Sequence, residues 1–145
     1  MNVVDIPIIL VVCYDFYFKR LVSVCYGTLE VLLVQITSFT KSFVIATIYR
    51  SPGALTNFLT ELSDLLSILV AKYDDFILAG DFNIHMDIET NESCKKLTEL
   101  FHNFGLRQHV NLPTHTGGHI LDLVISKENT QLVQSFCFKR YIRSS

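Results

Sequence analysis

The residues with the clearest potential for chemistry follow a short apolar run in the middle of the chain. Ile77-Leu78-Ala79-Gly80 leads directly into Asp81-Phe82-Asn83. If the apolar run is a strand that stops at Gly80, successive side chains alternate between its two faces. We therefore expect the side chains of Asp81 and Asn83 to point the same way and to share one pocket.

This pair of residues suits the hydrolysis of a phosphate ester. An aspartate can hold a divalent cation or orient a water, and an amide can donate to a phosphate oxygen without adding negative charge. A local explanation competes with this one, because Asp and Asn favour Asx turns after strands whatever the function of the protein. Spacing alone favours the local explanation.

A second acid stands in an unexpected place. Ile120 to Ser126 is an apolar strand pattern interrupted by one carboxylate, Asp122. A carboxylate in such a strand needs a partner, because burial of an unpaired charge is strongly unfavourable. The sequence predicts that Asp122 points into a polar site or that its strand lies at a sheet edge.

Two groups of residues could supply metal ligands. His85 with Asp87 offers nitrogen and oxygen ligands, although a polar loop is the favoured interpretation. His115, His119 and Asp122 suggest zinc, but in a loop the spacing of the two histidines does not place them on one helical face, and neither a thiol nor a third histidine stands near them. A zinc site there is disfavoured.

Composition indicates one folded domain. Of the 145 residues, 50% are hydrophobic and 18% are charged, which excludes general intrinsic disorder. The net charge of −2 gives no overall basic field for nucleic acid, so such a contact needs a local patch. The four cysteines are scattered without a CxxC pair, which indicates reduced thiols in an intracellular protein.

Periodicity predicts a hairpin followed by a helix. β-rich runs at 29–36 and 42–49 flank a polar-leaning connection at 37–41, which is typical of two antiparallel strands. The next segment has apolar residues at helical spacing and polar residues between them, so we expect an amphipathic helix. Its expected buried stripe consists of Leu55, Phe58, Leu59, Leu62, Leu65, Leu66, Leu69 and Val70.

Further along, the run at 76–79 is continuously apolar and predicts a strand buried on both faces. A second helix follows and ends at Gly105, with Leu97, Leu100, Phe101 and Phe104 on its packing face. Near the start of the chain, Ile6 to Phe18 is too short and too interrupted for a membrane span, and no basic start favours a secretory signal. Contact with a membrane is therefore not expected.

Four motifs in order point to a family. They are Ile48-Tyr49-Arg50-Ser51-Pro52, Gly80-Asp81-Phe82-Asn83, Pro113-Thr114-His115 and Gly118-His119-Ile120-Leu121-Asp122-Leu123-Val124. Together they resemble the endonuclease/exonuclease/phosphatase family, specifically the endonuclease domain of LINE-type (non-LTR) retrotransposons. The resemblance covers about 28–130 as a partial domain, with 1–27 as a divergent leader and 131–145 as a short tail.

The resemblance implies an α/β fold, a partial two-sheet α/β sandwich with helices packed outside mixed sheets. It further implies an active site at one end of the sheets, a magnesium ion and hydrolysis of a DNA phosphodiester, with no small-molecule cofactor. DNA is the implied partner, and the implied location is nuclear. No run of lysine and arginine provides an import signal, however.

Residue roles carried over from the family fall on matching positions. Tyr49 resembles the tyrosine beside the phosphate, Asp81 the water-orienting acid and candidate metal ligand, and Asn83 the phosphate-contacting amide. Asp122 resembles the acid that supports a catalytic histidine. The candidate substrate contacts are Arg50, Asn83 and His119, and Arg50 could equally form a surface ion pair.

Departures from the family pattern reduce the expected activity. An early asparagine and a metal-binding glutamate precede the Tyr-Arg motif in the family, but the first 26 residues contain no glutamate, and the strand alternation favours a solvent-facing role for Glu30. Nothing after Asp122 supplies the aspartate or histidine of the family's final Ser-Asp-His motif. We expect a truncated, weakly active or inactive nuclease. The alternatives are a non-catalytic remnant that binds nucleic acid or protein, and a fragment without a selected function.

Overall fold

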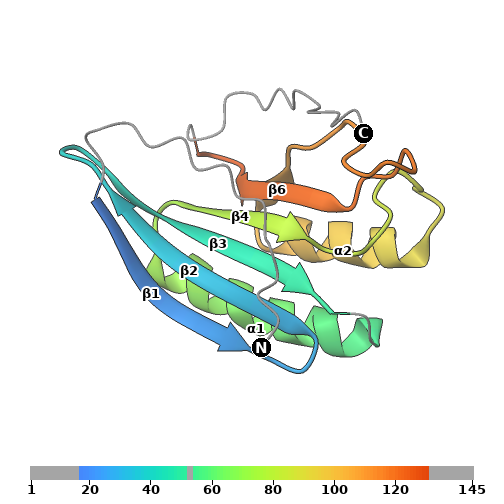
Figure 1. Ribbon diagram of the computed structural model, residues 1–145, viewed down its shortest axis with the longest axis horizontal. Coiled ribbons are helices and arrows are strands. Elements are labelled where there is room, and N and C mark those ends of the chain that lie inside the picture. Colours follow the sequence, from blue (N-terminus) through green and yellow to red (C-terminus); the bar gives the residue numbers. More distant parts are fainter. Residues whose placement is uncertain (1–16, 52–53, 131–145) are drawn as a thin grey trace, which may run out of the picture.

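Eight elements make up the part of the chain that the computed structural model describes, residues 17–51 and 54–130 (Figure 1). In chain order they are β1 (Tyr17–Cys25), β2 (Leu29–Thr37), β3 (Ser42–Arg50), α1 (Leu55–Lys72), β4 (Phe76–Asp81), α2 (Glu92–Asn103), β5 (Leu106–Gln108) and β6 (Asp122–Lys127).

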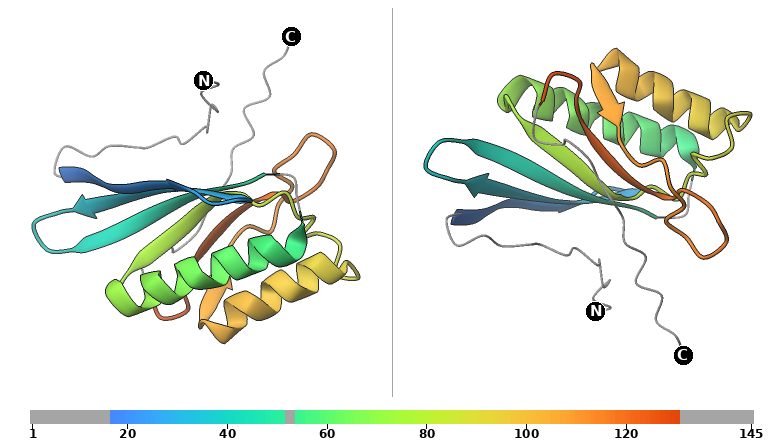
Figure 2. Two further views of the ribbon diagram at one scale, coloured as in Figure 1. Left: turned by 90° about the horizontal axis from the view of Figure 1, so that it is seen from below. Right: turned by 90° about the horizontal axis from the view of Figure 1, so that it is seen from above.

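The strands form a mixed sheet in the order β1-β2-β3-β4-β6-β5. β3 and β4 are parallel, joined through α1, and the other neighbours are antiparallel. Both helices cover the same face of this sheet (Figure 2). The α/β class, with helices outside a mixed sheet, is confirmed. In the described ranges the strands belong to one sheet of six.

The predicted hairpin and both predicted helices are present. β2 pairs with β3 from Leu29↔Arg50 to Thr37↔Ser42. α2 starts at the N-cap Asn91, whose side chain accepts from the Ser93 N–H. Gly105 follows its end in a left-handed conformation (φ 63°), as the sequence predicted.

The core lies between the helices and the facing side of β2, β3, β4 and β6. Five of the eight expected α1 residues are buried there, namely Phe58, Leu62, Leu65, Leu66 and Leu69. Val70 was wrongly included, because it is 37% exposed. It lies about 100° around the helix from Leu69, beyond the buried stripe.

The prediction for β4 was wrong in one respect. Phe76 and Leu78 are buried, but Ile77 and Ala79 are only half-buried, and the strand continues to Asp81. The reason is that the helices cover one face of the sheet, whereas the described residues cover the other face only in part. An uninterrupted apolar run is compatible with either arrangement.

Part of the proposed leader belongs to the sheet. β1 pairs antiparallel with β2, from Tyr17↔Thr37 to Cys25↔Glu30. Residues 1–16, which contain most of the apolar run starting at Ile6, and the tail 131–145 lie outside the described residues. Within the described ranges, no helix is both long and apolar enough to cross a membrane.

A close approach between two strands requires glycine at the end of β4. Gly80 has a φ of 154°, and a Cβ added there would lie 1.8 Å from the backbone oxygen of Ile48 on β3. The backbone of Ile48 cannot move away from an added Cβ as the end of a flexible side chain could. Gly80 is therefore the residue that allows β3 and β4 to pair up to their ends.

We expect Gly80→Ala to lower the free energy of unfolding by roughly 2–4 kcal/mol, because the new methyl group must displace a backbone carbonyl. Gly105→Ala is the matched control, since its φ of 63° is also left-handed but no atom lies within 4 Å of an added Cβ. It should cost only about 1–2 kcal/mol. Urea denaturation measures both, and equal losses would contradict the close-approach explanation.

Candidate functional site

A row of polar residues crosses four neighbouring strands at one end of the sheet. Glu30 is the partner of Tyr49, Tyr49 of Asp81, and Asp81 of Asp122. Laterally paired residues present their side chains to the same face. Each member is half-buried, whereas the preceding β3 residue, Ile48, is buried on the helix side. The row therefore lies on the face away from the helices.

This arrangement resolves the alternatives for Asp122. β6 lies between β4 and β5, so the proposed position at a sheet edge was wrong. The carboxylate instead joins the polar row. Burial raises the pKa of Asp122, and the nearby charge of Asp81 raises it further, while a hydrogen bond from Thr114 and the charge of His115 act in the opposite direction. Two carboxylates thus share a half-buried position.

The loop after β4 is anchored by Phe82, which is fully buried. Its ring makes edge-to-face contacts with Phe58 of α1 at 6.2 Å and with Phe101 of α2 at 6.1 Å. Its N–H donates to the Leu121 carbonyl at 3.0 Å. These contacts fix the backbone between Asp81 and Asn83, which stand on either side of the buried ring.

Asp81 forms the Asx turn that the local explanation predicted. The Asn83 N–H donates to Asp81 Oδ1 at 2.9 Å, and the φ of Asn83, 49°, is left-handed. The Nδ2 of Asn83 also donates to the Arg50 carbonyl at 2.8 Å. Because an amide nitrogen carries two N–H groups, this bond orients the side chain and leaves a second donor for a ligand.

Arg50 ties the end of β3 to the same loop. Its Nη1 donates to the Asn83 carbonyl at 3.1 Å, and the guanidinium lies 5.2 Å from the centroid of the Phe58 ring. Its Nε is buried. These contacts place Arg50 in a half-buried position between two backbone segments, and its contact with a DNA phosphate or an ion pair stays a prediction.

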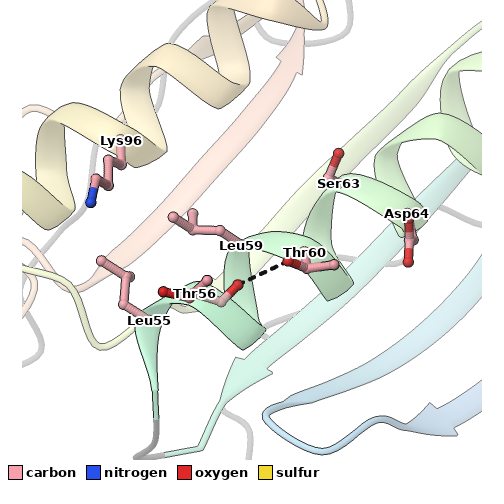
Figure 3. A pocket seen from close by; sticks show the side chains of 7 residues that line it. All are labelled: Leu55, Thr56, Leu59, Thr60, Ser63, Asp64 and Lys96. Atoms are coloured by element: carbon pink, nitrogen blue, oxygen red, sulfur yellow. Dashed lines mark hydrogen bonds between the residues drawn. The ribbon is translucent and has the colours of Figure 1, made fainter.

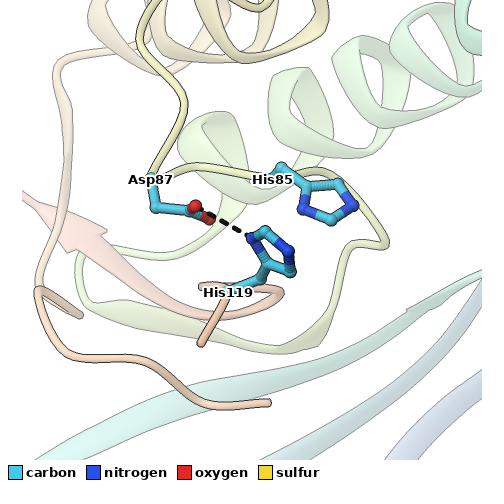
Figure 4. Close-up of side chains that lie close together, drawn as sticks. All are labelled: His85, Asp87 and His119. Atoms are coloured by element: carbon cyan, nitrogen blue, oxygen red, sulfur yellow. Dashed lines mark hydrogen bonds and ion pairs between the residues drawn. The ribbon is translucent and has the colours of Figure 1, made fainter. Parts of the chain in front are cut away.

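His119 lies with a different group than the sequence suggested. Its Nδ1 is 3.0 Å from Asp87 Oδ2, and the ligand atoms of His85, Asp87 and His119 lie within 4.8 Å of one another (Figure 4). The hydrogen bond from His119, followed by that from the Ile120 N–H, lowers the pKa of Asp87 to about 2. His115 is exposed, and its Nδ1 accepts from the Gly117 N–H.

Sequence reasoning missed two supporting residues. The Thr114 hydroxyl accepts from the N–H groups of Leu121 and Asp122, each at 3.0 Å, and so fixes the start of β6. The available signal was a hydroxyl residue in a loop ahead of a strand, which is typical of side-chain caps. The second supporting residue is Phe82. Its only mark in the sequence is that it is a single aromatic residue between two polar ones.

A surface pocket of about 420 Å³ lies away from the polar row, between the first half of α1 and one lysine of α2 (Figure 3). It is lined by Leu55, Thr56, Leu59, Thr60, Ser63, Asp64 and Lys96. Its lining includes none of the candidate site residues.

We expect Asn83→Ala to lower the free energy of unfolding by roughly 1–3 kcal/mol, because alanine is strained in the left-handed region and the bond to Arg50 is lost. Asn83→Gly removes only the bond and should cost about 0.5–1.5 kcal/mol. Thermal and urea denaturation compare the two variants. Equal costs would show that backbone conformation is not the reason for asparagine here.

The comparisons with known proteins identify the family and the fold. A family model described as "Endonuclease-reverse transcriptase" matches residues 43–143, more than half of the chain. No match was found among curated proteins. D. rerio TDP2 humanised by 14 mutations is similar in structure, with a TM-score of 0.50 and 15% identity over 76% of this chain.

An endonuclease/exonuclease/phosphatase family protein from Bacteroides thetaiotaomicron is similar to the same degree, with a TM-score of 0.50 and 11% identity over 77% of this chain. The chain spans 52% of the length of each of these two structures. At such low identity these likenesses establish the fold, and the matched model establishes the family. This chain belongs to the endonuclease-reverse transcriptase family, and its fold is similar to that of an endonuclease/exonuclease/phosphatase family protein.

Proposed function

We propose that this chain is endonuclease sequence of a LINE-type retrotransposon and that it hydrolyses DNA phosphodiesters slowly, with Mg²⁺. The observation that carries the proposal is the row Tyr49, Asp81 and Asp122, followed at once by Asn83 in a fixed turn. These are the residues to which the family resemblance assigns catalytic roles. Their register brings them together from three strands.

The carboxylates of the row fit a magnesium ion. Mg²⁺ prefers oxygen ligands and usually binds through one or two carboxylates. Burial and the charge of Asp81 raise the pKa of Asp122, so a cation at this position would offset an existing electrostatic cost. Asp81 is the proposed ligand, and Glu30, two strands away in the same row, is the described glutamate best placed to assist it.

The protein groups then have distinct tasks. The second N–H of Asn83 and the Tyr49 hydroxyl would donate to phosphate oxygens, and the Phe82 anchor holds Asn83 in position. A bound Mg²⁺ would supply charge stabilisation at the phosphate. Within the described ranges, histidines make no hydrogen bond to Asp122, and His115 acts on it only through its charge. Slow turnover follows from that missing proton-transfer contact.

We expect the purified chain to nick supercoiled plasmid DNA in Mg²⁺ but not in EDTA. Asp81→Asn should reduce the rate at least about 10²-fold, because it removes charge from the metal ligand while preserving shape. Asp64→Asn, which alters an exposed acid on α1, should leave the rate unchanged. DNA binding without nicking would favour the non-catalytic alternative, and nicking that survives Asp81→Asn would overturn the assignment.

We expect Asp122→Asn to stabilise the metal-free protein at neutral pH. A pKa raised in the folded state means that the contribution of Asp122 to stability is present below its unfolded pKa and is lost as the pH rises through the folded value. The higher stability of Asp122→Asn should therefore disappear at acidic pH, where Asp122 is protonated. Melting temperatures of both proteins across the pH range measure this difference. A variant that is less stable than the unchanged protein at pH 7 would contradict the burial argument.

A further inference from the structure

A second group of metal-binding side chains lies outside the polar row. His85 and Asp87 belong to the loop after β4, and His119 belongs to the loop before β6 (Figure 4). Their ligand atoms lie within 4.8 Å of one another, and the two imidazole rings are 4.2 Å apart at an interplanar angle of 82°. The group includes neither Asp81 nor Asp122.

The two loops that carry these residues are hydrogen-bonded to each other. The Met86 N–H donates to the Ile120 carbonyl at 3.1 Å, and the Ile120 N–H donates to Asp87 Oδ1 at 3.0 Å. The His119 carbonyl accepts from the Thr114 N–H at 2.9 Å. The backbone therefore holds the three side chains close together before any ligand binds, which reduces the ordering cost of binding.

One atom of the group has no hydrogen-bond partner among the described residues. Nδ1 of His85 is buried and unpaired, an arrangement that is costly for an imidazole nitrogen. A cation in contact with it would accept its lone pair and satisfy it. Beside it, His119 Nδ1 donates to Asp87 Oδ2 at 3.0 Å, a separation that one metal ion can also bridge.

We propose that His85, Asp87 and His119 bind one Zn²⁺ ion, with a fourth position open to water. Two neutral imidazoles and a carboxylate form a common zinc ligand set with three protein ligands. Ligands at about 2.1 Å from one ion are at most about 4.2 Å apart, so small side-chain rotations close the remaining gap. Coordination through His119 Nδ1 requires the proton on this nitrogen to leave to solvent, and a neutral imidazole takes one proton up from solvent at Nε2, so the ligand stays neutral.

The site is independent of the proposed nuclease function, since it uses nitrogen ligands that Mg²⁺ does not prefer and a different set of residues. Zinc there would join the loop that follows Asp81 to the loop that precedes Asp122. The consequence is stabilisation of both loops, whether or not the row hydrolyses DNA. Metal binding and nicking can therefore succeed or fail separately.

The test is a titration of the tag-free, reduced, metal-free chain with Co²⁺, followed by competition with Zn²⁺. We expect saturable d–d absorption from one ion per chain, displaced by Zn²⁺, and a higher melting temperature with metal. His119→Gln and Asp87→Asn should each weaken binding at least about tenfold. Asp87→Asn retains an oxygen to accept from the Ile120 N–H, so it preserves the loop contact.

Matched controls separate this site from other ligands. His102→Gln changes an exposed imidazole on α2, and Asp64→Asn changes an exposed acid on α1; both should bind Co²⁺ as the unchanged protein does. Binding that is lost in Asp81→Asn, a thiolate charge-transfer band, or unchanged affinity in folded Asp87→Asn would each overturn the proposal. Circular dichroism of the metal-free variants verifies that they are folded.

Discussion

The burial of Phe82 between the two helices is the contact on which the site depends. Its ring touches Phe58 of α1 and Phe101 of α2, while its backbone is bonded to the strand region before β6. Asp81 and Asn83 owe their positions to that anchor, because each is one residue away from it. Loss of packing between the helices would thus displace residues of the polar row.

The pairing of β3 with β4 is the second contact that positions the site, because it places Tyr49 beside Asp81. Gly80 lets the two backbones approach, and Tyr49 then lies between Glu30 and Asp81. Arg50, one residue later, faces the helix side and closes the loop onto the end of β3. Side chains of the polar row and side chains that support the fold therefore alternate along the end of β3, as expected for a strand.

Local patterns in the sequence were enough to predict α1, α2 and the β2–β3 hairpin, because these depend on spacing within one segment. They also singled out Asp81, Asn83 and Asp122, whose catalytic roles stay predictions. The register that aligns Glu30 with Tyr49, and the contact of His119 with Asp87, depend on how distant segments pair. Such pairings leave no periodic signal, so the sequence suggested two separate histidine groups where the structure has one.

The opposed acids of β4 and β6 have a consequence for folding. If either strand slipped by one residue, its acid would turn toward the helix side, where Phe58 and Leu62 form the core. Burial of a carboxylate there would be prohibitive, so the acids exclude the shifted pairing. Asp81 and Asp122 thus help to select the native strand register. This selection of the register would persist in a copy of the sequence that had lost its chemistry.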